Sequence, residues 1–180
     1  MNLYLAGHGI TLDGRYHFIP QELRYTNEDA VRHNAITQNH LQRWLASVPA
    51  RKSVILIDTC ESGSFSQSLA VMRGMVEKTA IDRLSKATGR ATIVAATETQ
   101  PAMEGYEGHG VFTYAILEAL RYADRDFGNR DGITGLFELA AYVYARVPEI
   151  TMRAFRFEQL PQVHMQGSDF PIGVVLPVTP

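Results

Sequence analysis

Three short aliphatic runs stand out in the hydrophobic pattern of the chain. Residues 3–6, 53–58 and 91–97 lack the polar alternation of a half-exposed strand, which is typical of strands buried on both faces of a parallel sheet. A turn signal at Asp13 and Gly14 lies between two further apolar runs and predicts a hairpin. Residues 172–176 are expected to add one short strand near the end of the chain.

Three segments with helical periodicity separate these runs. Thr134 is predicted to cap the start of the last segment. Pro49 and Pro148 are expected to end the first and last helices. Strands that alternate with helices predict an α/β fold with a mainly parallel sheet flanked by helices. The three helical segments span residues 35–48, 111–122 and 136–147.

Composition and charge narrow the class of protein. The chain has 180 residues, of which 46% are hydrophobic and 20% are charged, as in an ordinary soluble domain. The formal net charge of −2 provides no basic field for nucleic acid or an anionic membrane. We find no apolar run of membrane-spanning length and no secretory signal at the start of the sequence. We therefore expect one cytoplasmic domain with neither nucleic acid nor membrane as a partner.

A histidine and the single cysteine follow two of the predicted strands. His8 comes after the first aliphatic run, between two glycines, and Cys60 comes two residues after the second run. The carboxyl ends of parallel strands line one crevice, so we expect the two side chains to converge. A thiol becomes an effective nucleophile when an imidazole takes its proton. The alternative is that Cys60 only fills space, because free cysteines are commonly buried.

Four short stretches of sequence occur in an informative order. They read YLAGHG (4–9), IDTCESG (57–63), EGYEGHGVFTYA (104–115) and GSDFP (167–171). In this order they resemble the caspase-like cysteine peptidases of the metacaspase and prokaryotic (bacterial) orthocaspase type. The order of His8 and Cys60 agrees with the caspase pattern, in which the histidine precedes the cysteine by about fifty residues. The resemblance covers nearly the whole chain and implies a caspase-like (caspase-hemoglobinase) fold and cysteine-type endopeptidase activity.

The resemblance also implies roles for individual residues. It makes His8 the general base and Cys60 the nucleophile, with the backbone N–H groups of Gly9 and Cys60 as the oxyanion hole. Metacaspases carry an aspartate two positions before the cysteine, where Asp58 stands here, and use it in an acidic S1 pocket for Arg or Lys. The implied partners are protein or peptide substrates with a basic P1 residue. The alternative for Asp58 is a buried carboxylate that caps backbone N–H groups.

The chain departs from the family pattern in two places. Family members have two strands and their helices before the histidine strand, whereas His8 lies close to the first residue, so we expect these N-terminal strands to be missing. Residues 3–6 would then form an exposed apolar sheet edge that a flanking domain or partner covers. Ala6 stands where many metacaspases carry a serine. A catalytically silent caspase-like scaffold, or a fragment of a larger multidomain protein, is the alternative function.

By this resemblance, residues 1–180 form a single caspase-like domain with three parts. Residues 1–66 correspond to the large subunit with the dyad, 67–90 to a mobile connection with one helix near 75–87, and 91–180 to the small subunit. Basic residues of the connection are candidates for self-cleavage, and their alternative is a solvated helix face. These residues are Arg73, Lys78, Arg83, Lys86 and Arg90.

Three further candidate sites have a weaker basis. His109 lies in a second Gly-His-Gly but precedes a helix and follows the cysteine, so a place near the helix N-terminus is expected rather than a role as base. His33 and His40 have no partner at metal-ligand spacing and are expected on the surface. Residues 124–138 match a calcium loop imperfectly and predict an Asp-Gly turn before a helix. The resemblance implies no organic cofactor, and calcium activation, which occurs among metacaspases, has no identifiable ligand here.

Overall fold

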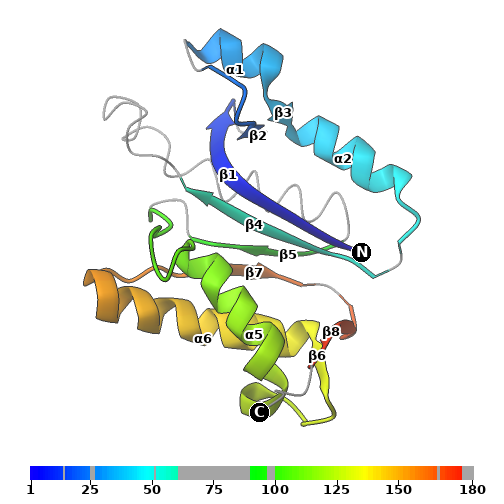
Figure 1. Cartoon of the computed structure of the whole chain (residues 1–180). Helices are drawn as coiled ribbons and strands as arrows, with labels where there is room; N and C mark the ends of the chain where they lie inside the picture. The colour runs from blue at the N-terminus through cyan, green and yellow to red at the C-terminus, as the bar shows by residue number, and fades with distance from the viewer. Residues whose placement is uncertain are drawn as a thin grey trace.

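One mixed β-sheet with helices on both faces forms the centre of the molecule (Figure 1). The computed structural model describes residues 1–13, 15–24, 27–50, 52–60, 90–96, 100–165 and 167–175, without the side chains of residues 11 and 60. The strands are β1 Asn2–Leu12, β2 Arg15–Ile19, β3 Ile36–Thr37, β4 Val54–Cys60, β5 Ala91–Val94, β6 Ile133–Gly135, β7 Gln162–His164 and β8 Pro171–Val174. The described helices are α1 Glu28–Asn34, α2 Gln38–Ser47, α5 Val111–Phe127 and α6 Leu136–Phe155.

The order of strands in the main sheet is β3-β2-β1-β4-β5-β7. β1, β4 and β5 run parallel, while β2, β3 and β7 are attached antiparallel to their neighbours. β6 and β8 form a separate antiparallel pair. The predicted α/β fold is therefore confirmed, with a sheet that is mixed and only partly parallel.

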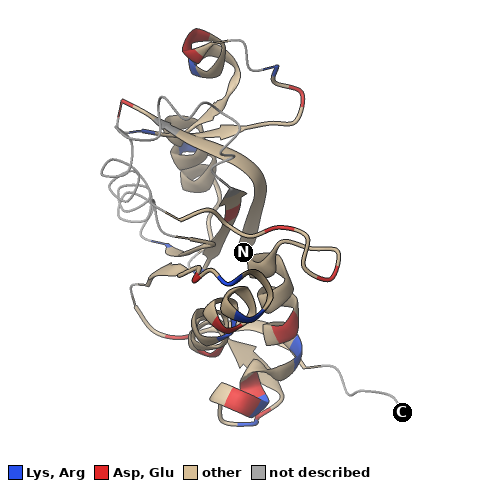
Figure 2. Cartoon of the chain, turned by 90° about the vertical axis from the view of Figure 1, so that its left-hand side faces the viewer, with Lys and Arg blue, Asp and Glu red and all other residues tan. Residues whose placement is uncertain are grey.

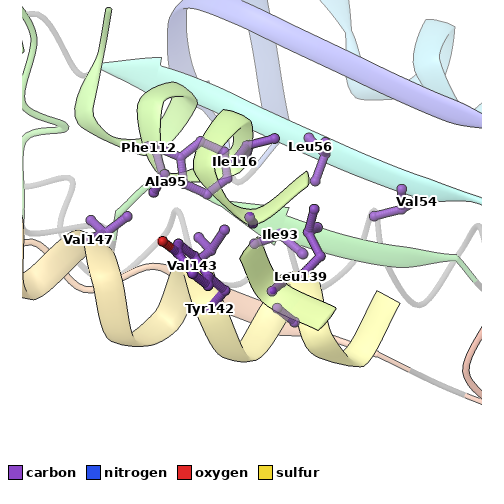
Figure 3. Close-up of a cluster of buried hydrophobic side chains, with 14 of the residues drawn as sticks. Val54, Leu56, Ile93, Ala95, Phe112, Ile116, Leu139, Tyr142, Val143 and Val147 are labelled. Atoms are coloured by element: carbon purple, nitrogen blue, oxygen red, sulfur yellow. The ribbon is translucent and has the colours of Figure 1, made fainter. Parts of the chain in front are cut away.

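The two faces of β4 belong to two different cores. Val54 and Leu56 contact the core formed with α5 and α6, whereas Ile55 and Ile57 contact the core beneath α2. Figure 3 shows the first of these cores, in which side chains from β4, β5, α5 and α6 point toward one another. Each fully buried aliphatic side chain of this kind contributes roughly 1.5–3 kcal/mol to folding. Burial on both faces explains why the aliphatic run of β4 shows no polar alternation.

β1 and β4 are both longer than the hydrophobic pattern predicts. β1 continues through the glycines around His8, because the hairpin pairs its second half with β2, from His8 opposite Ile19 to Leu12 opposite Arg15. Cys60 is the last residue of β4 rather than part of the following loop. The prediction that each residue follows its strand is therefore wrong.

The first predicted helix is shorter in the structure, because its first residues belong to a strand. The helix predicted over 35–48 begins only at Gln38, because Ile36 and Thr37 pair with β2 as β3. The side chain of Thr37 then caps α2 by accepting the backbone N–H of His40 at 3.3 Å. α2 ends at Ser47, just before Pro49, as predicted.

The last long helix begins and ends differently from the prediction. Thr134 lies in β6, so Gly135 is the N-cap of α6, and its N–H donates to Glu138 at 2.9 Å. Pro148 lies inside α6, which continues to Phe155. Burial of Val147 and Ile150 on either side of the proline favours the continuous helix over the break that proline alone would cause.

The outer edge of β1 is only half covered. β2 pairs with residues His8 to Leu12, and no strand of the described part of the chain pairs with residues 2–7 on the side away from β4. The predicted sheet edge at residues 3–6 is thus present. Its neighbour is a mostly apolar cavity of about 440 Å³ whose lining includes Tyr4, Leu117 and Val174. No described helix has the length and apolar character required to span a membrane.

Candidate active site

His8 and Cys60 are neighbours across the central parallel strand pair. They are register partners of β1 and β4, so their backbones lie side by side at the carboxyl end of β4. Adjacent strands are about 4.8 Å apart. The imidazole of His8 is exposed to solvent. The strand pairing thus brings together the two positions that the sequence analysis selected.

Gly9 follows His8 inside the β1–β2 hairpin, opposite Phe18. A Cβ atom at this position would lie 2.8 Å from Cε2 of Tyr16 and 3.1 Å from Oγ1 of Thr59. Packing against the tyrosine ring therefore requires glycine here, independently of any role for the Gly9 N–H in an oxyanion hole.

Asp58 is buried where β4 meets the start of α5. Only 5% of the residue is exposed, and its Oδ2 accepts the hydroxyl proton of Thr113. The backbone N–H of Thr113 also lowers the pKa of this carboxyl. Gly110, the N-cap of α5, offers no side chain to the helix. Asp58 therefore lies against the N-terminal turn of α5 and is held there by the Thr113 hydroxyl.

Oδ1, the second carboxylate oxygen of Asp58, differs from Oδ2 in its hydrogen bonding. Oδ1 is buried and has no hydrogen-bond partner within the part of the chain that the structure describes. A buried carboxylate oxygen without a donor is costly in free energy. The carboxylate of Asp58 therefore retains acceptor capacity that the described residues do not use.

A chain of hydroxyl groups connects Asp58 to the exposed sheet edge. The Oη of Tyr4 lies 2.5 Å from Oγ1 of Thr113. Because the Thr113 proton is directed to Asp58, we infer that Tyr4 is the donor in this pair. The sequence analysis missed both residues, although Thr113 belongs to the quoted EGYEGHGVFTYA stretch.

The surroundings of Asp58 raise the pKa of its carboxyl above the usual value for an aspartate. Burial raises the pKa of the Asp58 carboxyl, and the negative charge of Glu104 raises it further, while the hydrogen bonds from Thr113 lower it. Burial also raises the pKa of Tyr4, with the charges of Asp58 and Glu104 acting in the same direction. The site is consequently acidic and partly desolvated.

The loop that carries Glu104 is held by a buried glutamine. Gln159 is completely buried, its Oε1 accepts the N–H of Met103 at 2.7 Å, and its Nε2 donates to the carbonyl of Ala95 at 2.8 Å. The N–H of Val111 donates to the carbonyl of Met103 at 2.8 Å. These bonds hold Met103, next to Glu104, in place before α5.

His109 and His33 lie where they were expected, whereas His40 does not. His109 is exposed and pairs through its backbone with Tyr106 just before α5, and His33 is exposed on α1. The prediction that His40 lies on the surface is wrong, because its ring is half-buried in the first turn of α2, where it accepts the N–H of Thr37 and stacks on Trp44. Among the described residues, no group of three His, Cys, Asp or Glu side chains is arranged to hold a metal ion.

The segment that resembles a calcium loop is an Asp-Gly turn. The carboxylate of Asp124 accepts the backbone N–H groups of Asp131 at 3.1 Å and Gly132 at 2.9 Å. Oδ1 of Asp131 accepts the N–H of Ile133 at 2.9 Å. These carboxylates stabilise the turn that leads to β6 and α6.

Arg90 is unsuitable as a self-cleavage site. Its guanidinium donates to Oγ of Ser53 at 2.7 Å and to the carbonyl of Leu45 at 2.6 Å, near the end of α2. A side chain held in this way is not available to a specificity pocket. The remaining candidates for processing, and the helix predicted near 75–87, lie outside the described residues.

The fold and the comparisons agree on the class of protein. A mixed sheet with helices on both faces, in which parallel strands pair a histidine with a cysteine, is consistent with a caspase fold. A family model described as the caspase domain matches residues 1–169, so the chain belongs to the caspase domain family. This family implies cysteine peptidase chemistry on protein substrates. No curated protein matches the chain.

Acidic and basic residues are mixed along α5 and α6, without segregation into a basic face (Figure 2).

Proposed function

We propose that the chain is a cysteine endopeptidase of the metacaspase or orthocaspase type, with His8 and Cys60 as its catalytic dyad. The observation that supports this function is the register of β1 and β4, which pairs the two residues. In this proposal residues 1–66 and 91–180 are the parts equivalent to the large and small subunits.

The reaction follows from the two groups. His8 takes the proton of the Cys60 thiol, and the thiolate sulfur attacks the scissile carbonyl carbon to form a C–S bond. The backbone N–H groups of Gly9 and Cys60 would stabilise the resulting oxyanion. The imidazolium gives its proton to the leaving amine as the C–N bond breaks. Water, activated by His8, then hydrolyses the thioester and restores the thiol.

Specificity for Arg or Lys at P1 is proposed from Asp58. Asp58 is two residues before Cys60 on β4, at the carboxyl end of the strand. A partly desolvated carboxylate makes a strong charge-assisted contact with a guanidinium or ammonium group. The unpartnered Oδ1 leaves Asp58 able to accept such a donor.

Hydrolysis of fluorogenic peptides tests this function. Peptides with Arg, Lys or Asp at P1 are compared with and without calcium, for the wild type and for Cys60→Ala, His8→Ala, His109→Ala and Asp58→Ala. We expect cleavage after Arg or Lys that is lost in the first two variants and retained in His109→Ala. Selective loss of cleavage at basic residues in Asp58→Ala would support its place in S1.

One outcome would replace the proposal. Folded wild-type protein that releases nothing from any peptide, under any of these conditions, would favour the catalytically silent scaffold. Thermal unfolding of each variant provides the control for folding.

A further inference from the structure

Tyr4 is connected to the buried carboxylate of Asp58 by a single hydroxyl group, that of Thr113. Resting on the proposed function, we infer that Tyr4 is a positioning residue for the P1 site, which acts on Asp58 through Thr113. The three residues come from three different elements, β1, α5 and β4. One chain of hydrogen bonds therefore joins the edge of the sheet to the carboxylate near Cys60.

The number of protons fixes the direction of these hydrogen bonds. A hydroxyl group has one proton to donate and can also accept. Oγ1 of Thr113 donates to Oδ2 of Asp58, and Oη of Tyr4 lies 2.5 Å from the same Oγ1. Tyr4 must therefore donate to Thr113. With Tyr4 on its acceptor side, the threonine hydroxyl keeps its proton on the side of Asp58.

Both hydrogen bonds act on the carboxylate of Asp58. Hydrogen bonds in a chain polarise one another, so the proton that Tyr4 donates strengthens the bond from Thr113 to Asp58. Oδ2 is anchored in this way, whereas Oδ1 has no partner among the described residues. An anchored Oδ2 fixes the direction of Oδ1, the atom proposed to accept a P1 donor. A binding group held by such supporting hydrogen bonds loses less freedom when its ligand arrives.

The surroundings leave Thr113 as the partner of the Tyr4 hydroxyl among the described residues. Tyr4 and Thr113 both line the mostly apolar cavity of about 440 Å³ beside β1, and none of the lining residues is charged. The titratable groups that act on Asp58 are Tyr4 from β1 and Glu104 from the loop before α5. Glu104 raises the pKa of Asp58, whereas the hydrogen bond from Thr113 lowers it. A weaker bond from Thr113 therefore raises the pKa of Asp58.

The kinetic test compares Tyr4→Phe with Tyr144→Phe, the same substitution at an exposed position of α6. For peptides with Arg at P1, we expect Tyr4→Phe to raise KM about two- to fivefold and to leave kcat within about twofold. The acidic limb of kcat/KM should move to higher pH, because Asp58 then ionises with a higher pKa. In a Thr113→Val background, Tyr4→Phe should change KM less than about 1.5-fold, since the link to Asp58 is already broken. Tyr144→Phe should leave KM and the pH profile unchanged, and thermal unfolding checks that each variant folds.

A second measurement does not depend on cleavage. NMR of isotope-labelled aspartate carboxyl carbons, in the full chain carrying Cys60→Ala, follows the ionisation of Asp58, whose signal is identified by its loss in Asp58→Asn. We expect a higher pKa of Asp58 in Tyr4→Phe than in Tyr144→Phe. Such a shift in a protein that cleaves no peptide would support the link from Tyr4 to Asp58 while the peptidase proposal fails. Equal pKa values of Asp58 in the two variants, an unchanged KM in an active enzyme, or an effect of Tyr4→Phe that persists in Thr113→Val would overturn the inference.

Discussion

Thr113, in the first turn of α5, donates its hydroxyl proton to the buried carboxylate of Asp58 on β4. This contact joins α5 to β4, the strand that ends at Cys60. It also orients the carboxylate of Asp58, which is proposed to line the S1 pocket. Thr113 is therefore a positioning residue for Asp58 in the proposed site.

Replacing Thr113 by valine tests this relationship. Thr113→Val keeps the shape of the side chain and removes the donor, so the free energy of unfolding should fall by about 1–3 kcal/mol. Thr113→Ser keeps the hydroxyl and should retain most of the lost stability. Urea unfolding measures both. If serine and valine destabilise the protein equally, the hydrogen bond has no special value, and the loss comes from packing alone.

The local sequence was sufficient to predict the central strands but not their exact ends. The aliphatic run predicts β4, and the positions of His8 and Cys60 after aliphatic runs make both of them candidates without reference to their pairing. The extension of β1 past His8 depends on pairing with β2, which a local pattern does not contain. α6 continues through Pro148 because residues on both sides of it are buried in the core.

The candidate site shows the same limit. The resemblance to metacaspases implies the role of Asp58, whereas Thr113 and Tyr4 reach the site through hydrogen bonds between β1, α5 and β4. Such contacts are tertiary, so only the fold brings these residues together. Gly110 belongs to the EGYEGHGVFTYA stretch of the sequence. Only the structure shows that a side chain at this position would lie close to the carboxylates of Asp58 and Glu104.

The raised pKa of Asp58 predicts how stability depends on pH. Burial raises the pKa of this carboxyl above its value in the unfolded chain, so between the two values the folded protein binds more protons. The contribution of Asp58 to the free energy of unfolding is therefore largest at low pH and decreases as the pH rises through the folded pKa. Asp58→Asn removes this dependence. The variant should gain stability relative to the wild type as the pH rises above about 4, the ordinary pKa of an aspartate, and the gain should level off above the folded pKa.

Urea unfolding of both proteins across this pH range gives the difference. Asp13 and Asp126, whose pKa values are lowered by Arg32 and Arg125, are present in both proteins, and their opposite contribution cancels. A difference in stability that is constant with pH would contradict a raised pKa for Asp58.

Gln159 is expected to be essential for the position of the loop that carries Glu104. Gln159→Leu would leave the N–H of Met103 and the carbonyl of Ala95 without their partner, and we expect a loss of about 2–4 kcal/mol in the free energy of unfolding. Gln21→Leu, at an exposed position, is the matched control and should change stability by less than about 0.5 kcal/mol. Chemical unfolding compares the two variants. Equal stability would show that the loop holds its place without Gln159.

The exposed half of β1 predicts self-association of the isolated chain. Residues 2–7 have no partner on this side among the described strands, and they contain no charged residue or proline, which commonly protect natural sheet edges. Asn2→Lys places a charge on this edge and should shift the protein toward the monomer in sedimentation velocity over a range of concentrations. Asn39→Lys, the same substitution at an exposed position of α2, should leave association unchanged. A wild-type chain that stays monomeric at every concentration, or equal effects of the two lysines, would contradict an adhesive edge. Association that responds to Asn2→Lys alone would show that the strand edge is the contact, and that a flanking domain or partner strand could cover it.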